Sequence, residues 1–307
     1  QDLNLKNEIV CSDDNNNNDD LQKRLMWHME TPYSAALVLD DKLNRVAKEK
    51  GLTVVLEGQG SDEINAGYKH YLVPYFIDSL KKYNLKNCLQ TYVKGSNEFK
   101  DSFLQKLVIQ GLKLILPRNF TNKFANNKYD FTKYFKDQSN NYNLENSFED
   151  DYDDNFSLLQ NAMFNDFNSK LLRVLRNKDR ISMSYGRELR VPFLDHELVE
   201  LSFSINDNMK IKEGRQKNLI IEAYRNILPK ETYTISKNKL LRSKLQSIKR
   251  SNLVRNTNEL LNKEVFFDRK LFPQELYADL KAKKFYDKSI LWRMSQIELL
   301  CQTFVDS

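Results

Sequence analysis

Hydrophobic residues near the start of the chain follow first a helical spacing and then an extended one. Over residues 33–50 they recur at intervals of three and four, which predicts an amphipathic helix that ends at Gly51. Residues 53–56 (TVVL) form an apolar run without alternation, which is typical of a strand buried on both faces of a parallel sheet. The order helix, strand, glycine loop and helix predicts an α/β part over residues 25–75.

The later chain is patterned mainly as helix. Residues 158–176 carry a helical core face, and residues 214–228 predict a further amphipathic helix. The expected buried face of the helix at 214–228 consists of Leu219, Ile220, Ala223, Tyr224, Ile227 and Leu228. Asp195 is expected to be the N-cap of a helix over residues 196–204. Residues 76–307 are therefore predicted to be mainly helical.

Two polar stretches divide this pattern. Residues 1–24 are polar and contain the run DDNNNNDD, so we expect a polar lead that forms a loop. Residues 121–155 are also polar and end in an acidic run, which predicts a mobile insertion. The remainder, residues 25–307, is expected to form one domain, since it contains no internal repeat.

The loop after the predicted strand contains the most informative residues, LEGQGSDE at 56–63. Gly58 and Gly60 permit positive φ and a close approach of a ligand to the backbone. Ser61 is expected to be an N-cap, so that the positive end of the next helix points into the same space. Such N–H groups hold a polyphosphate, and Asp62 adds an oxygen of the kind that Mg²⁺ prefers. A surface turn before an acidic helix start explains so short a string equally well.

A second string lies far along the chain, DRISMSYGRELRVPFLDH at 179–196. Together with LEGQGSDEINAGY it resembles the synthetase domain of glutamine-dependent asparagine synthetases, which carry strings such as SGEGSDELFGGY and DRxSMAxxxExRxPFLD. The resemblance extends over about residues 25–241. It implies an α/β fold with a parallel-sheet ATP-pyrophosphatase (adenine nucleotide alpha hydrolase-like) core. That core would be truncated here at its N-terminal side and followed by a large helical C-terminal portion.

The resemblance implies a reaction in two steps. ATP would adenylate the side chain of aspartate with release of pyrophosphate, and ammonia from glutamine would then give asparagine. ATP and Mg²⁺ are the implied cofactors. By analogy, ATP and pyrophosphate would be bound by Gly58, Gly60, Ser61 and Asp62, and Mg²⁺ by Asp62. Lys217, near the start of the predicted helix at 214–228, would reach the phosphates and is a candidate catalytic residue.

Gln59 is a departure from the family pattern, which usually has glutamate between the two glycines. The resemblance implicates that glutamate in positioning the attacking ammonia. Gln59 can form hydrogen bonds but cannot accept a proton near neutral pH. Glu57, two residues earlier, is a candidate electrostatic substitute. We therefore treat Gln59 as a candidate catalytic residue and expect it to alter the amination step more than adenylation.

Charged residues of the second string predict a structural network rather than a reactive site. Charges buried in proteins are usually paired. We therefore expect a buried ion network that locks helix to loop. Its expected members are Arg180, Arg187, Arg190, Asp179, Glu188 and Asp195.

Some parts of the family pattern are missing from this sequence. Members begin with a glutaminase domain that has an N-terminal cysteine nucleophile, and their first synthetase strand carries an SGGxDS loop. Neither occurs here, and the chain starts with Gln1. We therefore expect a C-terminal part of a longer protein or a degenerate remnant, inactive on its own. Another amide-forming ligase of this scaffold (β-lactam synthetase-like or a peptide cyclase) and a non-catalytic fragment are the alternatives.

Composition limits the classes of partner and the compartment that we expect for this protein. The net charge of +6 comes from scattered basic residues, which disfavours a nucleic-acid partner. Three cysteines without a CxxC pattern predict no disulfide framework and favour the cytoplasm. No apolar run is long enough to predict a membrane helix, and the three histidines lack metal-ligand spacing. The resemblance also allows a homodimer, with small-molecule substrates as the remaining partners.

Overall fold

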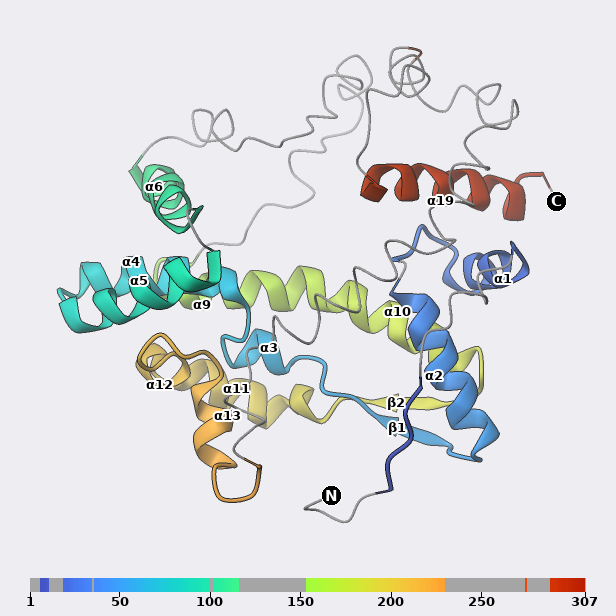
Figure 1. Ribbon diagram of the computed structural model, residues 1–307, viewed down its shortest axis with the longest axis horizontal. Helices are drawn as coiled ribbons and strands as arrows, with labels where there is room; N and C mark the ends of the chain where they lie inside the picture. The colour runs from blue at the N-terminus through green and yellow to red at the C-terminus, as the bar shows by residue number, and fades with distance from the viewer. Residues whose placement is uncertain are drawn as a thin grey trace.

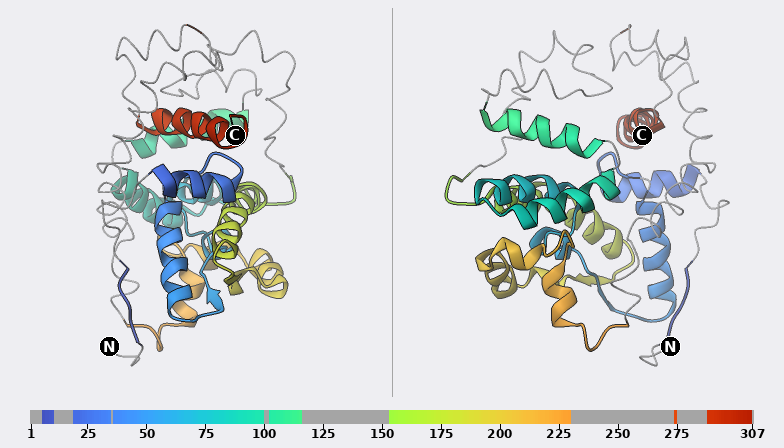
Figure 2. Two further views of the ribbon diagram at one scale, coloured as in Figure 1. Left: turned by 90° about the vertical axis from the view of Figure 1, so that its right-hand side faces the viewer. Right: turned by 60° about the vertical axis from the view of Figure 1, so that its left-hand side comes forward.

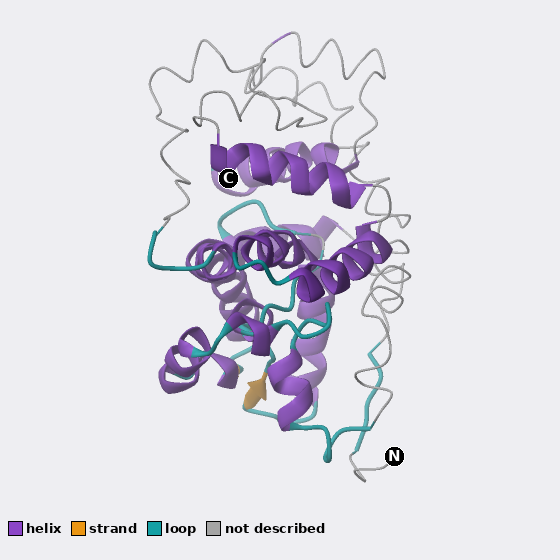
Figure 3. Ribbon diagram, turned by 90° about the vertical axis from the view of Figure 1, so that its left-hand side faces the viewer, coloured by secondary structure: helices purple, strands orange, loops and turns teal. Residues whose placement is uncertain are grey.

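The computed structural model of the protein describes seven parts of the chain (Figure 1). They are residues 6–10, 19–34, 36–99, 102–115, 153–229, 274 and 288–306. Of the predicted insertion at 121–155, all but the last three residues lies outside this described part. Helices make up most of the described structure, and Figure 3 shows how small the strand content is.

A two-stranded parallel sheet joins the two halves of the sequence. Strand β1 (Val54–Leu56) pairs with β2 (Glu188–Arg190), with Val55 opposite Leu189. The ladder continues beyond the strand, because the Glu57 amide donates to the Arg190 carbonyl at 2.9 Å. Figure 1 shows the carboxyl ends of both strands leading towards α3 and α11. The predicted strand and its parallel pairing are therefore confirmed.

The expected burial of β1 on both faces is wrong. Val54 and Leu56 point to the same face of the strand, and Leu56 is 68% exposed. Val55, on the other face, is half-buried. In the described part of the chain β1 pairs only with β2, so the sheet is too narrow to be covered on both sides. A run of apolar residues does not distinguish this half-covered strand from a central one.

Helices α1, α2, α10 and α19 surround one hydrophobic core. Their bounds are Asp19–Met29, Leu37–Glu49, Leu172–Met183 and Lys288–Phe304. The buried residues of this core are Leu25, Met26, Met29, Tyr33, Leu37, Ile181 and Leu299. The Trp292 indole of α19 donates to the Tyr33 carbonyl at 2.9 Å, and Figure 2 shows α19 crossing over α1. Helix α1 begins at Asp19, so the end of the expected 1–24 loop is helical.

A second core lies under the helices that follow the glycine loop. These are η2 (Lys69–Tyr71), α4 (Leu72–Lys81), α5 (Leu85–Phe99) and α6 (Ser102–Ile115). They pack against α9 (Leu158–Asn165), with Tyr71, Phe103 and Leu159 almost completely buried. The Asp78 carboxylate of α4 accepts hydrogen bonds from the Leu158 and Leu159 amides at the start of α9. Burial raises the pKa of Asp78, although these two hydrogen bonds oppose the rise.

The predicted helix over 158–176 is confirmed, with an irregularity. Ser157 forms a capping box with Gln160 at the start of α9. A π-helical segment, η4 (Asp166–Leu171), then joins α9 to α10. Leu171, the last residue of this segment, is buried, and the next residue, Leu172, is exposed.

Between β2 and residue 229, where the described stretch ends, lie four short helical segments. They are η5 (Pro192–Leu194), α11 (His196–Ser204), α12 (Asp207–Lys210) and α13 (Asn218–Ala223). Asp195 caps α11 as predicted, since its side chain accepts from the Glu197 amide at 3.1 Å. The helix predicted over 214–228 is shorter, and its expected apolar face is largely open, with Ile227 61% exposed. None of the six residues of that face is buried in the described chain, which the sequence pattern alone could not reveal.

Candidate functional site

The glycine loop turns sharply between β1 and the short helix α3 (Ser61–Ile64). Gly60 adopts a left-handed conformation with φ of 88° and occupies the N-cap position of α3. The prediction that Ser61 is the N-cap is therefore wrong, because Ser61 already has helical conformation. Gly58 is exposed, and a Cβ atom added to it would meet no atom within 4 Å. Its backbone is therefore accessible to a ligand.

Gly60 brings the two motifs into direct contact. A Cβ atom at this position would overlap the side chain of Leu194, which belongs to the PFLD part of the second string. Glycine is required here for two reasons, because the backbone is left-handed and the space beside it is filled. The packing of Gly60 on Leu194 therefore fixes the loop against η5.

Asp62 and Lys217 form an ion pair across this contact. The Lys217 Nζ lies 2.8 Å from the Asp62 Oδ1, and both side chains are partly exposed. Lys217 was expected in the first turn of a helix. It is instead the N-cap of α13, in a left-handed conformation with φ of 55°. A side chain at Gly67 would overlap both the Asp62 carboxylate and the Lys217 side chain. Two residues predicted from separate motifs are thus held side by side.

Gln59 belongs to a polar chain that runs from the loop into helices α2 and α10. Its Nε2 donates to the Glu57 carboxylate at 3.3 Å. The Lys178 Nζ lies 3.2 Å from that carboxylate and 2.6 Å from Asp40 Oδ1. Lys178 is a member of this polar chain that sequence reasoning missed. It directly precedes the second string, but no pattern indicated that its side chain would reach the loop.

Burial and charge act in opposite directions on this polar chain. Burial lowers the pKa of Lys178, but Asp40 and Glu57 more than offset it, so that the pKa is raised overall. Burial raises the pKa of Asp40, although the nearby ammonium opposes the rise. The lysine is therefore positively charged at neutral pH and holds two acidic groups together.

The buried ion network predicted for the second string is wrong. Arg180 donates to the Met29 carbonyl at 2.9 Å and pairs with the exposed Glu30. Arg187 donates to main-chain carbonyls, including that of Tyr185 at 3.1 Å. Arg190 pairs with Glu188 at the surface. Arg180 and Arg187 thus donate to backbone carbonyls, while the carboxylate partners Glu30 and Glu188 are exposed, so no buried network of carboxylates forms.

Glu63, beside Asp62, has a structural role. It is buried and accepts a hydrogen bond from the Tyr68 hydroxyl at 2.6 Å. Burial, together with the carboxylate of Glu63, raises the pKa of Tyr68. The Gln216 amide donates to the Tyr68 carbonyl, which connects this pair to the segment that carries Lys217. Glu63, Tyr68 and Gln216 therefore connect the helix that carries Asp62 to the segment that carries Lys217.

Metal binding and membrane insertion can be judged for the described residues. Among them, no group of three or more histidine, cysteine, aspartate or glutamate side chains is arranged to hold a metal ion. A Mg²⁺ ion at Asp62 would therefore need most of its ligands from a phosphate-bearing substrate and water. Within the same residues, no helix is long and apolar enough to cross a bilayer.

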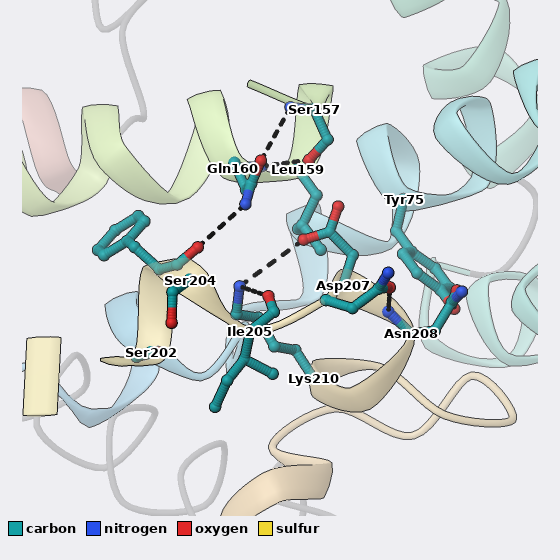
Figure 4. A network of polar contacts seen from close by, with 12 residues as sticks. Tyr75, Ser157, Leu159, Gln160, Ser202, Ser204, Ile205, Asp207, Asn208 and Lys210 are labelled. Atoms are coloured by element: carbon teal, nitrogen blue, oxygen red, sulfur yellow. Dashed lines mark hydrogen bonds and ion pairs between the residues drawn. The ribbon is translucent and has the colours of Figure 1, made fainter. Parts of the chain in front are cut away.

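A second polar cluster lies where α9, α11 and α12 meet (Figure 4). Lys210 is completely buried, and its Nζ donates to the Ile205 carbonyl at 2.8 Å. The same Nζ lies 3.7 Å from the Asp207 carboxylate. Burial lowers the pKa of Lys210. Because its hydrogen bond closes the end of α11, this lysine has a structural role.

Comparison with known proteins places the chain in a family. A model of the family described as "Asparagine synthase" matches residues 4–302. The glutamine-hydrolyzing asparagine synthetase 1 of Bacillus subtilis is 27% identical over 229 residues, which cover 67% of this chain and 33% of that protein. The human glutamine-hydrolyzing asparagine synthetase is 44% identical over 64 residues, which cover 20% of this chain and 11% of the relative.

A further relative shows a similar short match. The glutamine-hydrolyzing asparagine synthetase 3 of Bacillus subtilis is 42% identical over 59 residues, covering 19% of this chain and 10% of that protein. The matches thus span a third or less of these relatives' length. The family model, by contrast, extends over nearly all of the chain. The chain belongs to the asparagine synthase family.

Proposed function

We propose that this chain is the ligase part of an enzyme that adenylates the side chain of aspartate with ATP and then forms asparagine. The proposal includes the ATP-pyrophosphatase-like core and ammonia derived from glutamine by a separate glutaminase domain. The pairing of Asp62 with Lys217 at 2.8 Å is the observation that supports it best. Family membership supports an amide-forming ligase, and the ion pair supplies the two charge types that adenylation needs.

In the first step, an oxygen of the aspartate side chain attacks the α-phosphorus of ATP. The bond from that phosphorus to the bridging oxygen breaks, and pyrophosphate leaves with the bonding electrons. Lys217 would stabilise the negative charge that develops on the leaving group. Gly58 and Gly60 would let backbone N–H groups of the loop, with Ser61, approach the phosphates.

In the second step, ammonia attacks the carbonyl carbon of the aspartyl adenylate. A C–N bond forms, the C–O bond to AMP breaks, and the attacking nitrogen loses one proton. Gln59 would contact the nucleophile, although its amide cannot take that proton. Gln59 therefore has a positioning role in this proposal.

Asp62 would hold the Mg²⁺ ion that accompanies ATP. A single carboxylate fits this ion, because Mg²⁺ usually takes one or two carboxylates and completes its shell with phosphate oxygens and water. When bound, the ion would neutralise phosphate charge. Lys217, already paired with Asp62, would meet the same phosphates from the side of α13.

Aspartate-dependent ATP–pyrophosphate exchange tests the proposal. In the full-length protein, Lys217→Met should lower exchange by about a hundredfold, since a cation at a developing oxyanion is worth about 3 kcal/mol. Lys212→Met, an exposed lysine in the preceding turn, is the matched control and should leave exchange unchanged. An unchanged rate of ATP–pyrophosphate exchange in Lys217→Met would show that the lysine has no role in adenylation.

A separate measurement tests the expected dependence on other segments. We expect purified residues 1–307 to exchange pyrophosphate poorly, because a loop of the SGGxDS type is missing from the sequence. Robust exchange by residues 1–307 would contradict this part of the proposal.

Gln59 favours a second candidate, another amide-forming ligase in which the amine belongs to the substrate itself. A screen of carboxylate substrates by pyrophosphate exchange separates the two. Aspartate as the preferred substrate supports asparagine formation. Preference for a larger substrate with an internal amine supports the second candidate, and no exchange with any substrate supports a non-catalytic remnant.

A further inference from the structure

The Gln59 side chain has a defined orientation because a carboxylate lies beside it. An ionised glutamate only accepts hydrogen bonds, so the Gln59 NH₂ group must face Glu57, as the 3.3 Å contact has it. The carbonyl oxygen is on the opposite corner of the amide and therefore faces away from Glu57. This assignment follows from hydrogen-bonding chemistry and would reverse only if Glu57 became a donor.

Lys178 determines where that carboxylate stands. Its ammonium bridges Glu57 on the loop and Asp40 on α2, with contacts of 3.2 Å and 2.6 Å. The three side chains are largely shielded, with exposures of 15% for Lys178, 21% for Glu57 and 13% for Asp40. Without the ammonium, two carboxylates would face each other in a partly desolvated space. Glu57 would then turn towards water and release Gln59.

The outward carbonyl of Gln59 differs from the donor groups of the site. Lys217 and the loop amides are donors, which suit phosphate oxygens. A carbonyl oxygen repels such anions and accepts from an N–H group instead. The chain thus has separate groups for the leaving group and for a nitrogen nucleophile.

We propose that Lys178 is a positioning residue that, through Glu57, turns the carbonyl oxygen of Gln59 towards the N–H bonds of the attacking amine. This inference rests on the proposed function, because it assigns the recognition of the nucleophile to that reaction. Its ammonium is engaged by Glu57 and Asp40, so the proposal gives Lys178 no contact with the substrate or the reacting atoms. Its effect is on aminolysis, and the adenylation step does not depend on it.

The activity test compares aminolysis with adenylation in the full-length protein. With ammonium chloride as nitrogen source, Lys178→Met and Glu57→Gln should each lower the amide formed per pyrophosphate released by about tenfold, equivalent to about 1.4 kcal/mol. ATP–pyrophosphate exchange should stay within about twofold of the wild-type rate. Lys178→Arg should restore much of the ratio, because arginine can also bridge two carboxylates. Lys48→Met, an exposed lysine on α2, is the control.

A second measurement does not depend on activity. In protein labelled with ¹⁵N in glutamine side chains, Gln59→Asn identifies the Gln59 amide signal. That signal should shift in Lys178→Met and in Glu57→Gln but not in Lys48→Met. Glu57→Gln keeps the size of the side chain, so the test survives if Lys178→Met fails to fold.

Two results would overturn the inference: an unmoved Gln59 signal in Glu57→Gln, or an unchanged ratio of amide to pyrophosphate in the variants that fold. Absence of pyrophosphate exchange in the wild-type protein would instead refute the proposed function. The Gln59 signal would still report whether Lys178 and Glu57 orient the amide.

Discussion

Replacing Gly60 by alanine tests how the loop is held against the second motif. The new methyl group meets two obstacles. The left-handed backbone, with φ of 88°, costs an L-residue roughly 1–2 kcal/mol. The overlap with Leu194 adds about 1–3 kcal/mol if that side chain must move within its packing. The expected loss in the free energy of unfolding is therefore about 2–5 kcal/mol.

Two other glycines separate these contributions. Gly51 has φ of 72° but open space around it, so Gly51→Ala should cost only the backbone strain, roughly 1–2 kcal/mol. Gly58 has open space and no positive φ, so Gly58→Ala should be close to neutral. Alanine lowers the entropy of the unfolded chain equally in all three variants, so this effect cancels in the comparison.

Equilibrium unfolding in urea measures the free energy of unfolding of the three glycine variants. A double variant completes the test. The double variant Gly60→Ala/Leu194→Ala should be less destabilised than the sum of its single changes, because the overlap disappears. If Gly60→Ala cost no more than Gly51→Ala, or if the two changes were additive, the loop would not be fixed by Leu194. Our reasoning about motif contact would then fail.

Two further predictions concern buried groups away from the loop. Lys210→Met should destabilise the protein by about 3–5 kcal/mol in urea unfolding, because it leaves the buried carboxylate of Asp207 without its cation, whereas the exposed Lys212→Met should not. Adding Asp207→Asn should recover part of that loss, and no recovery would contradict the pairing. Burial and the neighbouring Asp166 raise the pKa of Tyr71, so the folded state keeps a proton that the unfolded chain loses above about pH 10. The free energy of unfolding should therefore fall as the pH rises above that value, and it should fall less steeply in Tyr71→Phe. The same steepness in both proteins would refute this role of Tyr71.

Local patterns predicted the elements whose causes are local. Apolar residues spaced by three and four predicted α2, and a short β-branched run predicted β1. One carboxylate before an apolar stretch predicted the N-cap at Asp195. Each depends on a few neighbouring residues. The pattern of the glycine loop singled out Asp62, family resemblance gave Lys217 its role, and the structure brings the two together.

The errors have causes that lie far along the chain. Ser61 seemed a better cap than Gly60 because hydroxyl capping is a local rule, whereas the turn at Gly60 also depends on packing by Leu194. The guanidinium group of Arg180 was assigned to carboxylates although it mainly binds backbone carbonyls, which no composition reveals. Lys178 was missed because its partners come from α2 and the loop, and only the folded chain places them around it.

The parallel pairing of β1 with β2 has a consequence for how the protein can change through evolution. Both motifs are fixed to each other by backbone hydrogen bonds between residues 54–57 and 188–190, so their separation in space does not depend on the length of chain between them. Closing a loop of twice the length costs only about 0.6 kcal/mol more. The segment between the motifs can therefore gain or lose residues while the glycine loop keeps its place against the second string. Folding speed is the quantity that such changes should alter, because distant pairings form slowly.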